Sequence, residues 1–458
     1  MAWSLDDTIV AIGTPLGEGG IGIIRVSGPE ALGVLQRLFA PHRPPPEGQA
    51  WVPWRLTYGH VREPESGALV DEALAVWMPA PKTYTRQDVA EIHCHGGLLP
   101  LRRVLDLCLQ AGARLAEPGE FTLRAFLNGR IDLAQAEAVV DVVRAKSQQG
   151  LEMAVGQLAG RLSERVGAVR ADLLTVLAHL EAAIDFPLDE IPPCDRVALL
   201  TRVGQSLDQL LAGAEQGAVY RQGIRTAIVG RPNVGKSSLL NALLQSDRAI
   251  VTPIPGTTRD TLEETVVVGG VPLILVDTAG ITEARDPIER LGVERSRAAV
   301  AASDLALLVL DGSQPPTAED EAIAGLLSER TALVVINKCD LPPAPGAERL
   351  LAGRPCVRVS ALTGQGLPEL EQAVLEAILA GRMQADEAPL VSRPRHVDAL
   401  RRAREQVAAA LLAAEQGWPD DCVATDIRGA VAALGEITGE TVSDDLVARI
   451  FADFCLGK

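Results

Sequence analysis

The fold of this chain is decided by residues 230–237, GRPNVGKS. An apolar run at residues 224–229 comes directly before this segment and predicts a buried strand, and a helical pattern opens at residues 238–244. Glycines between a strand and a helix let backbone N–H groups curl around phosphate oxygens at the helix N-terminus. The segment therefore predicts a phosphate-binding loop, in which Lys236 reaches the β- and γ-phosphates of a nucleotide and the Ser237 hydroxyl binds Mg²⁺.

Three further segments follow in a fixed order, and they are Asp277-Thr278-Ala279-Gly280, Asn337-Lys338-Cys339-Asp340 and Ser360-Ala361-Leu362. Apolar runs at residues 271–276 and 331–336 predict strands that end at the first two segments. The Asp340 carboxylate accepts hydrogen bonds from the N1 and 2-amino donors of guanine, which adenine lacks, so we expect selectivity against ATP of about 10⁴. We expect the Ala361 N–H to reach the guanine carbonyl. Since ordinary turns would have to recur in this order, the set indicates a guanine-nucleotide site.

The loop between the first two segments has the composition of a first switch. Residues 252–260, TPIPGTTRD, are rich in Pro and Gly. We expect Thr258 to be the second protein ligand to Mg²⁺, in place only with the γ-phosphate, and a solvated loop without a ligand role is the alternative. The residues expected to contact the nucleotide are Asn233, Val234, Gly235, Lys236, Ser237, Ser238, Thr252, Pro253, Ile254, Pro255, Gly256, Thr257, Thr258, Asp277, Thr278, Ala279, Gly280, Asn337, Lys338, Asp340, Ser360, Ala361 and Leu362.

The glutamine that orients the attacking water in Ras-type GTPases is replaced by Ile281. No arginine finger is evident either, and such a group contributes about 10³ to 10⁵ in rate. An alternative to an arginine finger is a monovalent cation, which the Asn233 amide oxygen would hold together with backbone carbonyls from the first switch. Glu289 is a candidate to position the water. Spacing alone favours the other interpretation of Glu289, a surface carboxylate on a helix.

Both ends of the chain carry further motifs: DTIVA at 7–11, GGIGIIRVSG at 19–28, PGEFTLRAFLN at 118–128, DLAQAEA at 132–138 and FCLGK at 454–458. Together with the nucleotide segments, these motifs resemble the MnmE (TrmE) family of tRNA-modification GTPases over essentially the whole chain. The resemblance implies a homodimer that works with the flavoprotein MnmG as a heterotetramer. This complex adds a carboxymethylaminomethyl or aminomethyl group at carbon 5 of the wobble uridine of certain tRNAs. It also implies a 5-formyl- or methylene-tetrahydrofolate derivative as the one-carbon source.

The same resemblance assigns roles to single residues. The resemblance implies a K⁺ ion that stimulates hydrolysis as the G domains dimerise, with the ligands Asn233, Thr252, Ile254 and Thr257. The implied Mg²⁺ ligands are Ser237 and Thr258. Glu289, within PIERLG at 287–292, becomes the water-positioning catalytic carboxylate, which reverses the preference from spacing. The implied folate contacts are Arg25, Glu91, Arg130 (a Lys in relatives) and Lys458, and Cys455 would serve the carbon chemistry. From the residues alone, an ordinary salt bridge for Arg25 and a buried apolar role for Cys455 remain alternatives.

The composition is that of a multidomain cytoplasmic protein. The chain has 458 residues, of which 47% are hydrophobic, enough for two to four domains. Its seven cysteines are odd in number and scattered, which argues against a disulfide framework. The first residues are acidic and have too few apolar side chains for a signal peptide, and no apolar run nears the length needed to cross a bilayer, so we expect neither feature.

The net charge of −17 is unusual for a tRNA enzyme, because nucleic-acid binders generally show a basic face. We therefore infer that MnmG supplies much of the tRNA contact. The local basic clusters are Arg102, Arg103, Arg393, Arg395, Arg401, Arg402 and Arg404. We interpret them as solvated helix faces that nearby acids balance.

The hydrophobic pattern predicts a multidomain fold of the α/β and all-α classes. The expected parts are 1–120, an α+β domain; 121–216, a first helical part; 217–381, an inserted Ras-like P-loop G domain with a mostly parallel sheet; and 382–458, a second helical part with the Cys-x-Gly-Lys tail. For 1–120 the family resemblance implies dimerisation and tetrahydrofolate binding. Further elements expected within them are strands at 21–26 and 73–78, helices at 396–415 and 426–434, and a break near 186–187.

Two other patterns and one other function were considered. Residues 91–95, EIHCH, resemble a metal cluster, but strand alternation separates Cys94 from His93 and His95, which favours ordinary strand residues. The glycines at 17–22 precede a strand, unlike a dinucleotide fingerprint. The alternative function is a nucleotide-switched, RNA-binding ribosome-assembly GTPase without carbon chemistry. Such proteins normally add a basic RNA-binding domain, and the sequence shows none.

Overall fold

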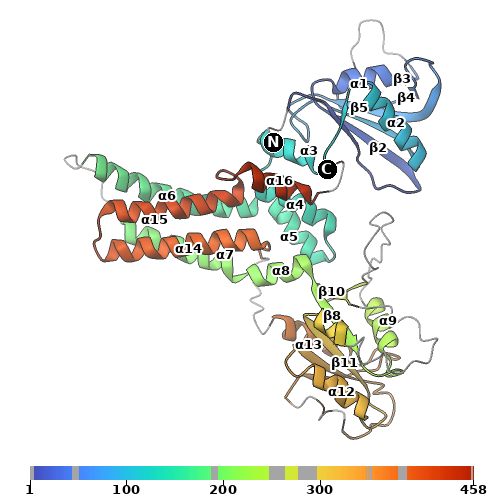
Figure 1. Ribbon diagram of the computed structural model, residues 1–458, viewed down its shortest axis with the longest axis vertical. Coiled ribbons are helices and arrows are strands. Elements are labelled where there is room, and N and C mark those ends of the chain that lie inside the picture. The colour runs from blue at the N-terminus through green and yellow to red at the C-terminus, as the bar shows by residue number, and fades with distance from the viewer. Residues whose placement is uncertain are drawn as a thin grey trace. The chain divides into compact units, whose positions relative to one another are not determined.

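A computed structural model describes residues 5–43, 51–186, 194–246, 264–276, 297–346, 348, 350, 353–379, 389–454 and 457. The described residues divide into two compact units (Figure 1). The first unit comes from Met1–Val140 and Ala432–Lys458, and the second comes from Asp141–Pro253 and Arg259–Val431. No helix in the part of the chain that the structure describes is long and apolar enough to span a membrane.

The first unit contains a seven-stranded sheet in the order β3-β4-β5-β6-β2-β1-β7. Neighbouring strands are antiparallel except for the parallel pair of β1 and β7. The helices α1 and α2 pack on the sheet, and their buried side chains, among them Leu35 and Leu107, form one core with Ile24 and Ile92. The elements are β1 Ile9–Ile12, β2 Gly19–Ser27, α1 Ala31–Leu38, β3 Phe39–Pro41, β4 Thr57–Arg62, β5 Leu69–Met78, β6 Val89–Gly96, α2 Leu98–Gln110 and β7 Arg114–Leu115. The strands predicted at 21–26 and 73–78 are confirmed.

Strand β6 shows the alternation that its sequence predicts. Cys94 faces the core, and burial raises the pKa of its thiol to about 11. His93 lies 3.2 Å from a Glu91 oxygen, and the exposed His95 lies 2.7 Å from an Asp71 oxygen. The two histidines therefore have carboxylate neighbours of their own, on a strand.

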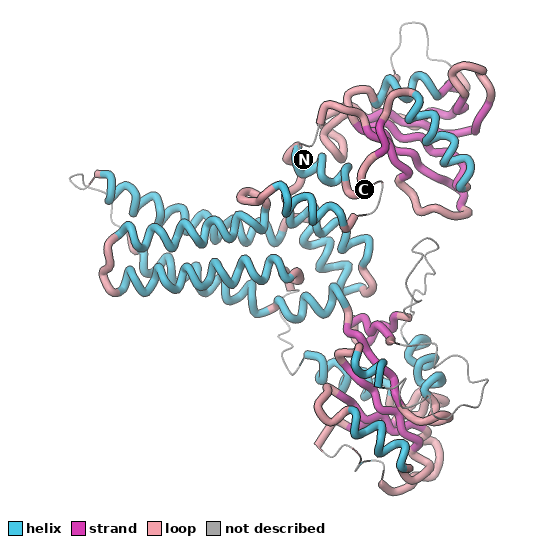
Figure 2. The backbone as a smooth tube through the Cα atoms, viewed as in Figure 1, coloured by secondary structure: helices cyan, strands magenta, loops and turns pink. Residues whose placement is uncertain are grey.

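The helical part of the chain comprises the helices between residues 120 and 222 and those between residues 394 and 452 (cyan in Figure 2). Helix α7 packs against α6 and α14, and α5 begins after Ser147, whose side chain caps the helix by accepting from the Gly150 N–H. Helix α6 ends at Asp185, next to the predicted break, and the two predicted C-terminal helices are confirmed within longer ones. The helices are α3 Glu120–Leu127, α4 Leu133–Arg144, α5 Gln148–Leu158, α6 Arg161–Asp185, α7 Arg196–Ala212, α8 Ala214–Gln222, α14 Pro394–Glu415, α15 Asp420–Thr438 and α16 Asp444–Ala452.

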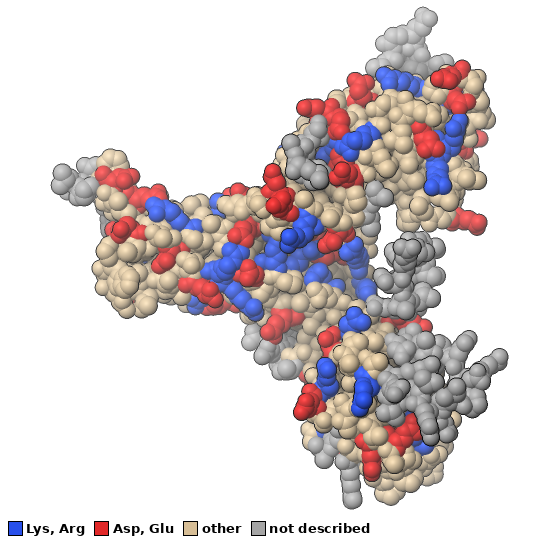
Figure 3. Space-filling model, viewed as in Figure 1, with Lys and Arg blue, Asp and Glu red and all other residues tan. Residues whose placement is uncertain are grey.

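Several arginines of the basic clusters pair with acids, as the sequence interpretation expected. Arg393 binds Asp141 at 2.8 Å, and Arg404 binds Asp208 at 2.8 Å. Arg402 pairs with Asp398 one helical turn earlier. Basic and acidic side chains accordingly lie among one another on the face shown in Figure 3.

The second sheet has the order β13-β12-β11-β8-β10-β9 and is parallel except for the antiparallel β9–β10 pair. Helices α9 and α13 cover one face and α12 covers the other, which explains why β11 is buried along its whole length. The elements are β8 Ile224–Val229, α9 Lys236–Ser246, β9 Thr265–Val268, β10 Val271–Leu275, β11 Leu305–Asp311, α12 Ala318–Leu326, β12 Ala332–Asn337, β13 Cys356–Arg358 and α13 Leu367–Leu379. The predicted strand at 224–229 matches β8 at both ends.

A buried ion network fixes the start of α3 in the first unit. Arg124 is 1% exposed and binds Glu120 at 2.9 Å and Asp7 at 2.5 Å. Glu120, 3% exposed, also accepts from Arg114 at 2.7 Å. Burial alone would raise the pKa of Glu120, but the hydrogen bonds from Arg114 and Arg124 outweigh it and hold this pKa below its usual value.

We predict that Glu120→Gln destabilises the protein by about 3–5 kcal/mol, because it leaves the buried Arg124 charge poorly compensated. Since the folded-state pKa of Glu120 is lowered, its contribution is fully present above the ordinary pKa of 4.5 and is lost as the pH falls below it. Thermal unfolding between pH 7 and acid pH should show a steeper loss for the native chain than for the variant. Glu117→Gln, at an exposed position, is the control, and equal stability of the two variants would contradict the assignment.

Candidate guanine-nucleotide site

The phosphate loop joins the end of β8 to the start of α9 and depends on two glycines. Gly230 has a φ of 150°, and a Cβ there would lie 2.3 Å from the Val309 carbonyl oxygen. Gly235 has a φ of 97°, and a Cβ there would lie 2.2 Å from the Asn337 side-chain nitrogen. Any other residue would therefore push the loop away from the neighbouring strands.

Lys236 and Ser237 open α9 at this loop. The Lys236 ammonium donates to the carbonyl oxygens of Gly230 at 2.6 Å and Arg231 at 2.8 Å, and its burial lowers its pKa. The ammonium is thus held over the loop. Ser237 and Ser238 are exposed in the first turn of the helix, where N–H groups and the helix dipole favour a phosphate.

Asn337, at the end of β12, connects three of the four predicted segments. Its side chain is 2% exposed, and its amide nitrogen donates to the Val234 carbonyl at 2.9 Å. Its amide oxygen accepts from the Ala361 N–H at 3.0 Å. This bond satisfies the buried Asn337 oxygen. The Ala361 N–H as a donor to the guanine carbonyl stays a prediction.

Lys338 connects the phosphate loop to the end of β11. Its ammonium donates to the Asn233 carbonyl at 2.9 Å and binds Asp311 at 2.6 Å. Asp311 also accepts from the backbone and hydroxyl of Ser313. Burial would raise the pKa of Asp311, but the bonds from Lys338 and Ser313 outweigh it and keep the carboxyl ionised. The sequence reasoning missed Asp311, although an acid directly after an apolar run was a signal.

Asp340 is the carboxylate that the sequence predicts to recognise the guanine base. The Ser360 hydroxyl donates to one of its carboxylate oxygens at 2.6 Å, so that the second oxygen can point outward. Leu362, two residues after Ser360, is 85% exposed. A carboxylate oriented in this way matches the paired N–H donors of guanine.

The structure brings together the predicted residues of the phosphate loop with those of the two later segments. The remaining nucleotide-site predictions, Thr252, Pro253, Ile254, Pro255, Gly256, Thr257, Thr258, Asp277, Thr278, Ala279, Gly280 and Glu289, lie outside the described residues. Cys455 and Lys458 lie outside them as well.

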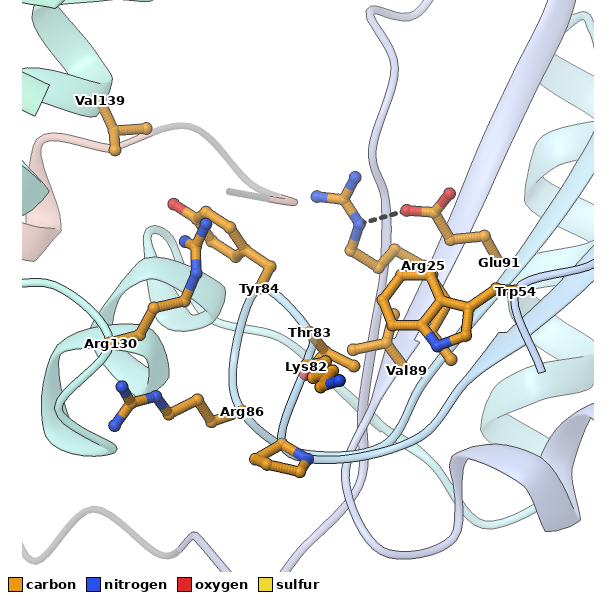
Figure 4. Close-up of a pocket in the computed structure, with 12 residues that line it drawn as sticks. Arg25, Trp54, Lys82, Thr83, Tyr84, Arg86, Val89, Glu91, Arg130 and Val139 are labelled. Atoms are coloured by element: carbon orange, nitrogen blue, oxygen red, sulfur yellow. Dashed lines mark hydrogen bonds and ion pairs between the residues drawn. The ribbon is translucent and has the colours of Figure 1, made fainter. Parts of the chain in front are cut away.

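A second candidate site is a cavity of about 630 Å³ in the first unit (Figure 4). Three of the predicted folate contacts, Arg25, Glu91 and Arg130, line it. Arg25 and Glu91 are cross-strand partners on β2 and β6 and form an ion pair at 2.8 Å. Hydrogen bonds from His93 and then Arg25 lower the pKa of Glu91. The Arg130 guanidinium lies 4.7 Å from the centre of the Tyr84 ring.

Sequence reasoning missed the other polar and aromatic walls of this cavity. Trp54, Lys82, Tyr84 and Arg86 all line it. Three of them alternate in the loop PKTYTR, residues 81–86, between β5 and β6. This alternate spacing was the only indication in the sequence that they share a site, because a loop sequence does not show in which direction its side chains point.

A mostly parallel sheet, a phosphate loop after β8 and a carboxylate positioned for guanine after β12 define a P-loop guanine-nucleotide-binding protein.

Comparisons with known proteins place the chain within a family. A family model described as the GTP-binding protein TrmE N-terminus matches residues 8–130, and one described as the MnmE helical domain matches residues 133–455. A protein of Roseiflexus sp. (strain RS-1) named tRNA modification GTPase MnmE is 52% identical over 99% of both chains. One of the same name from Chloroflexus aurantiacus is 52% identical over 99% of this chain and 100% of its own. The chain belongs to the MnmE family.

Among solved structures, the translation elongation factor SelB of Methanococcus maripaludis with the GTP analogue GppNHp is 21% identical. It covers 36% of this chain and 35% of its own, with a TM-score of 0.27, and no conclusion rests on this likeness.

We predict that Asp340→Asn lowers GTP affinity by at least about 10²-fold, because the amide cannot accept both guanine donors. The same variant should gain affinity for xanthosine triphosphate, whose 2-oxo group accepts from the new amide. Fluorescence titration with labelled nucleotides measures both. Glu369→Gln, an exposed acid on α13, is the matched control, and unchanged GTP affinity in Asp340→Asn would remove Asp340 from base recognition.

Proposed function

We propose that this chain hydrolyses GTP as the GTPase of a tRNA-modifying complex. The observation that carries the proposal is the pair of hydrogen bonds by which the Asn337 side chain connects the phosphate loop at Val234 to Ala361 in the last nucleotide segment. The full-length identity with relatives named tRNA modification GTPase MnmE supports the tRNA part. Within this function, residues 217–381 hydrolyse GTP, residues 1–120 dimerise and bind folate, and residues 121–216 with 382–458 link them.

The reaction that we propose is the addition of a carboxymethylaminomethyl or aminomethyl group at carbon 5 of the wobble uridine. The chain acts in the cytoplasm as a homodimer, with MnmG as the second component. Its net charge of −17 supports a division of labour in which MnmG contributes much of the tRNA contact.

For hydrolysis we propose that a K⁺ ion at Asn233 replaces the missing arginine finger as two G domains pair. Asn233 is exposed, has a left-handed φ of 64°, and has its carbonyl fixed by Lys338. A strained residue held in place by its neighbours is typical of a functional position. Mg²⁺ would be held by Ser237 and Thr258, and Glu289 would position the water.

The cavity in the first unit fits a folate. Its aromatic rings suit a flat heterocycle, and its cationic side chains suit glutamate carboxylates. Arg25, Glu91, Arg130 and Lys458 would hold the folate, which supplies the one-carbon unit when bound. The Arg25–Glu91 pair gives the site a fixed donor and acceptor edge, because Glu91 stays ionised at neutral pH.

The test of the tRNA function is nucleoside mass spectrometry of bulk tRNA from cells lacking this chain. We expect the 5-substituted wobble uridine to disappear and to return with the intact gene, but not with a chain truncated before Lys458. An unchanged nucleoside profile would overturn the proposal and favour a ribosome-assembly role, which ribosome profiles on gradients would then examine.

We predict that GTP turnover falls when KCl is replaced by NaCl, and that Glu289→Ala abolishes fast turnover while GTP binding is retained. The cation and the carboxylate act on the reacting water and phosphate, so binding does not depend on them. Turnover that is insensitive to the cation would remove the K⁺ role, and turnover retained in Glu289→Ala would remove the carboxylate's role.

A further inference from the structure

The cavity of the first unit is cationic, although the chain as a whole is acidic. Its charged lining residues are Arg25, Lys82, Arg86, Arg130 and Glu91. Since Arg25 pairs with Glu91, the positive charges of Lys82, Arg86 and Arg130 are left over. In a chain with 60 acidic and 43 basic residues, such an excess in one cavity requires an explanation.

These three cations have no carboxylate partner among the described residues. Arg86 donates to the Asn128 carbonyl at 2.9 Å, and Arg130 lies over Tyr84. Lys82 is exposed, and none of the described acids forms an ion pair with it. Elsewhere in the first unit, Arg103 and Arg114 are paired with acids, while Arg37 and Arg62 donate to backbone carbonyls outside the cavity.

The loop that carries Lys82, Tyr84 and Arg86 is rigidly held. The buried hydroxyls of Thr85 and Ser27 lie 2.7 Å apart, and the Asn128 amide donates to the Thr85 carbonyl at 2.6 Å. The Thr83 hydroxyl donates to the Gln87 carbonyl at 2.6 Å. Arg86 itself has a left-handed φ of 57°. Because these hydrogen bonds already hold the loop backbone, ligand binding does not have to order it, and only the cationic side chains lose freedom.

The charges match a particular form of the proposed ligand. A folate with a single glutamate presents its α- and γ-carboxylates, and each further γ-linked glutamate adds one negative charge. We propose that Lys82, Arg86 and Arg130 form a subsite for the γ-glutamyl tail, so that the cavity selects polyglutamylated folate over the monoglutamate. This inference rests on the proposed folate function of the same cavity.

The test is calorimetric titration of the full-length protein with 5-formyl-tetrahydrofolate bearing one or three glutamates. We expect the triglutamate to bind on the order of tenfold more tightly at low salt, and the ratio to shrink as salt screens the charges. In Lys82→Met/Arg86→Gln the ratio should fall to about one. Lys82→Met alone, at an exposed side chain, should lower the ratio partly, and Lys146→Met, which removes an exposed cation that does not line the cavity, should not change it.

Three results would overturn the inference, and they are distinguishable. Equal affinity of the native protein for both folates removes the tail subsite but leaves the folate function standing. Absence of binding by either folate removes the proposed folate function as well. A ratio that survives in the double variant, together with weakened tRNA binding, would show that the cations contact RNA phosphates instead.

Discussion

The buried amide of Asn337 is the interaction on which the nucleotide site depends. Its nitrogen donates to the Val234 carbonyl and its oxygen accepts from the Ala361 N–H. Both polar atoms of this buried amide therefore have hydrogen-bond partners only when the phosphate loop and the last segment are in place. Gly235 follows from this constraint, because a Cβ there would strike the same amide. Lys338 repeats the arrangement one residue later by binding the Asn233 carbonyl and Asp311.

The sequence predicted the elements of this site better than their mutual contacts. The strand at 224–229 was predicted to its ends because a doubly covered parallel strand is a continuous apolar run between turn residues. Asp311 was missed because its bond to Lys338 depends on β11 and β12 being neighbours in the sheet. The order of the strands in this sheet is set by the whole fold and cannot be read from any one segment of the sequence.

The cavity of the first unit shows the same division. Resemblance supplied Arg25, Glu91 and Arg130, and the ordinary salt bridge considered for Arg25 is present, formed with Glu91. The pairing required the register of β2 against β6, which alternation alone does not fix. Lys82 and Arg86 could not be predicted, because the orientation of a loop is set by tertiary hydrogen bonds such as those of Asn128.

The paired bridges made by Asn337 and Lys338 have a consequence for how nucleotides are distinguished. Because Asn337 and Lys338 bond the phosphate loop to the segment that carries Asp340, the places proposed for the phosphates and for the base are rigidly connected. Base binding and phosphate binding should therefore be coupled. The binding free energy of GTP should exceed the sum of those of guanosine and inorganic triphosphate measured separately. When the base of a nucleotide does not fit, the protein should therefore also bind its phosphates less tightly.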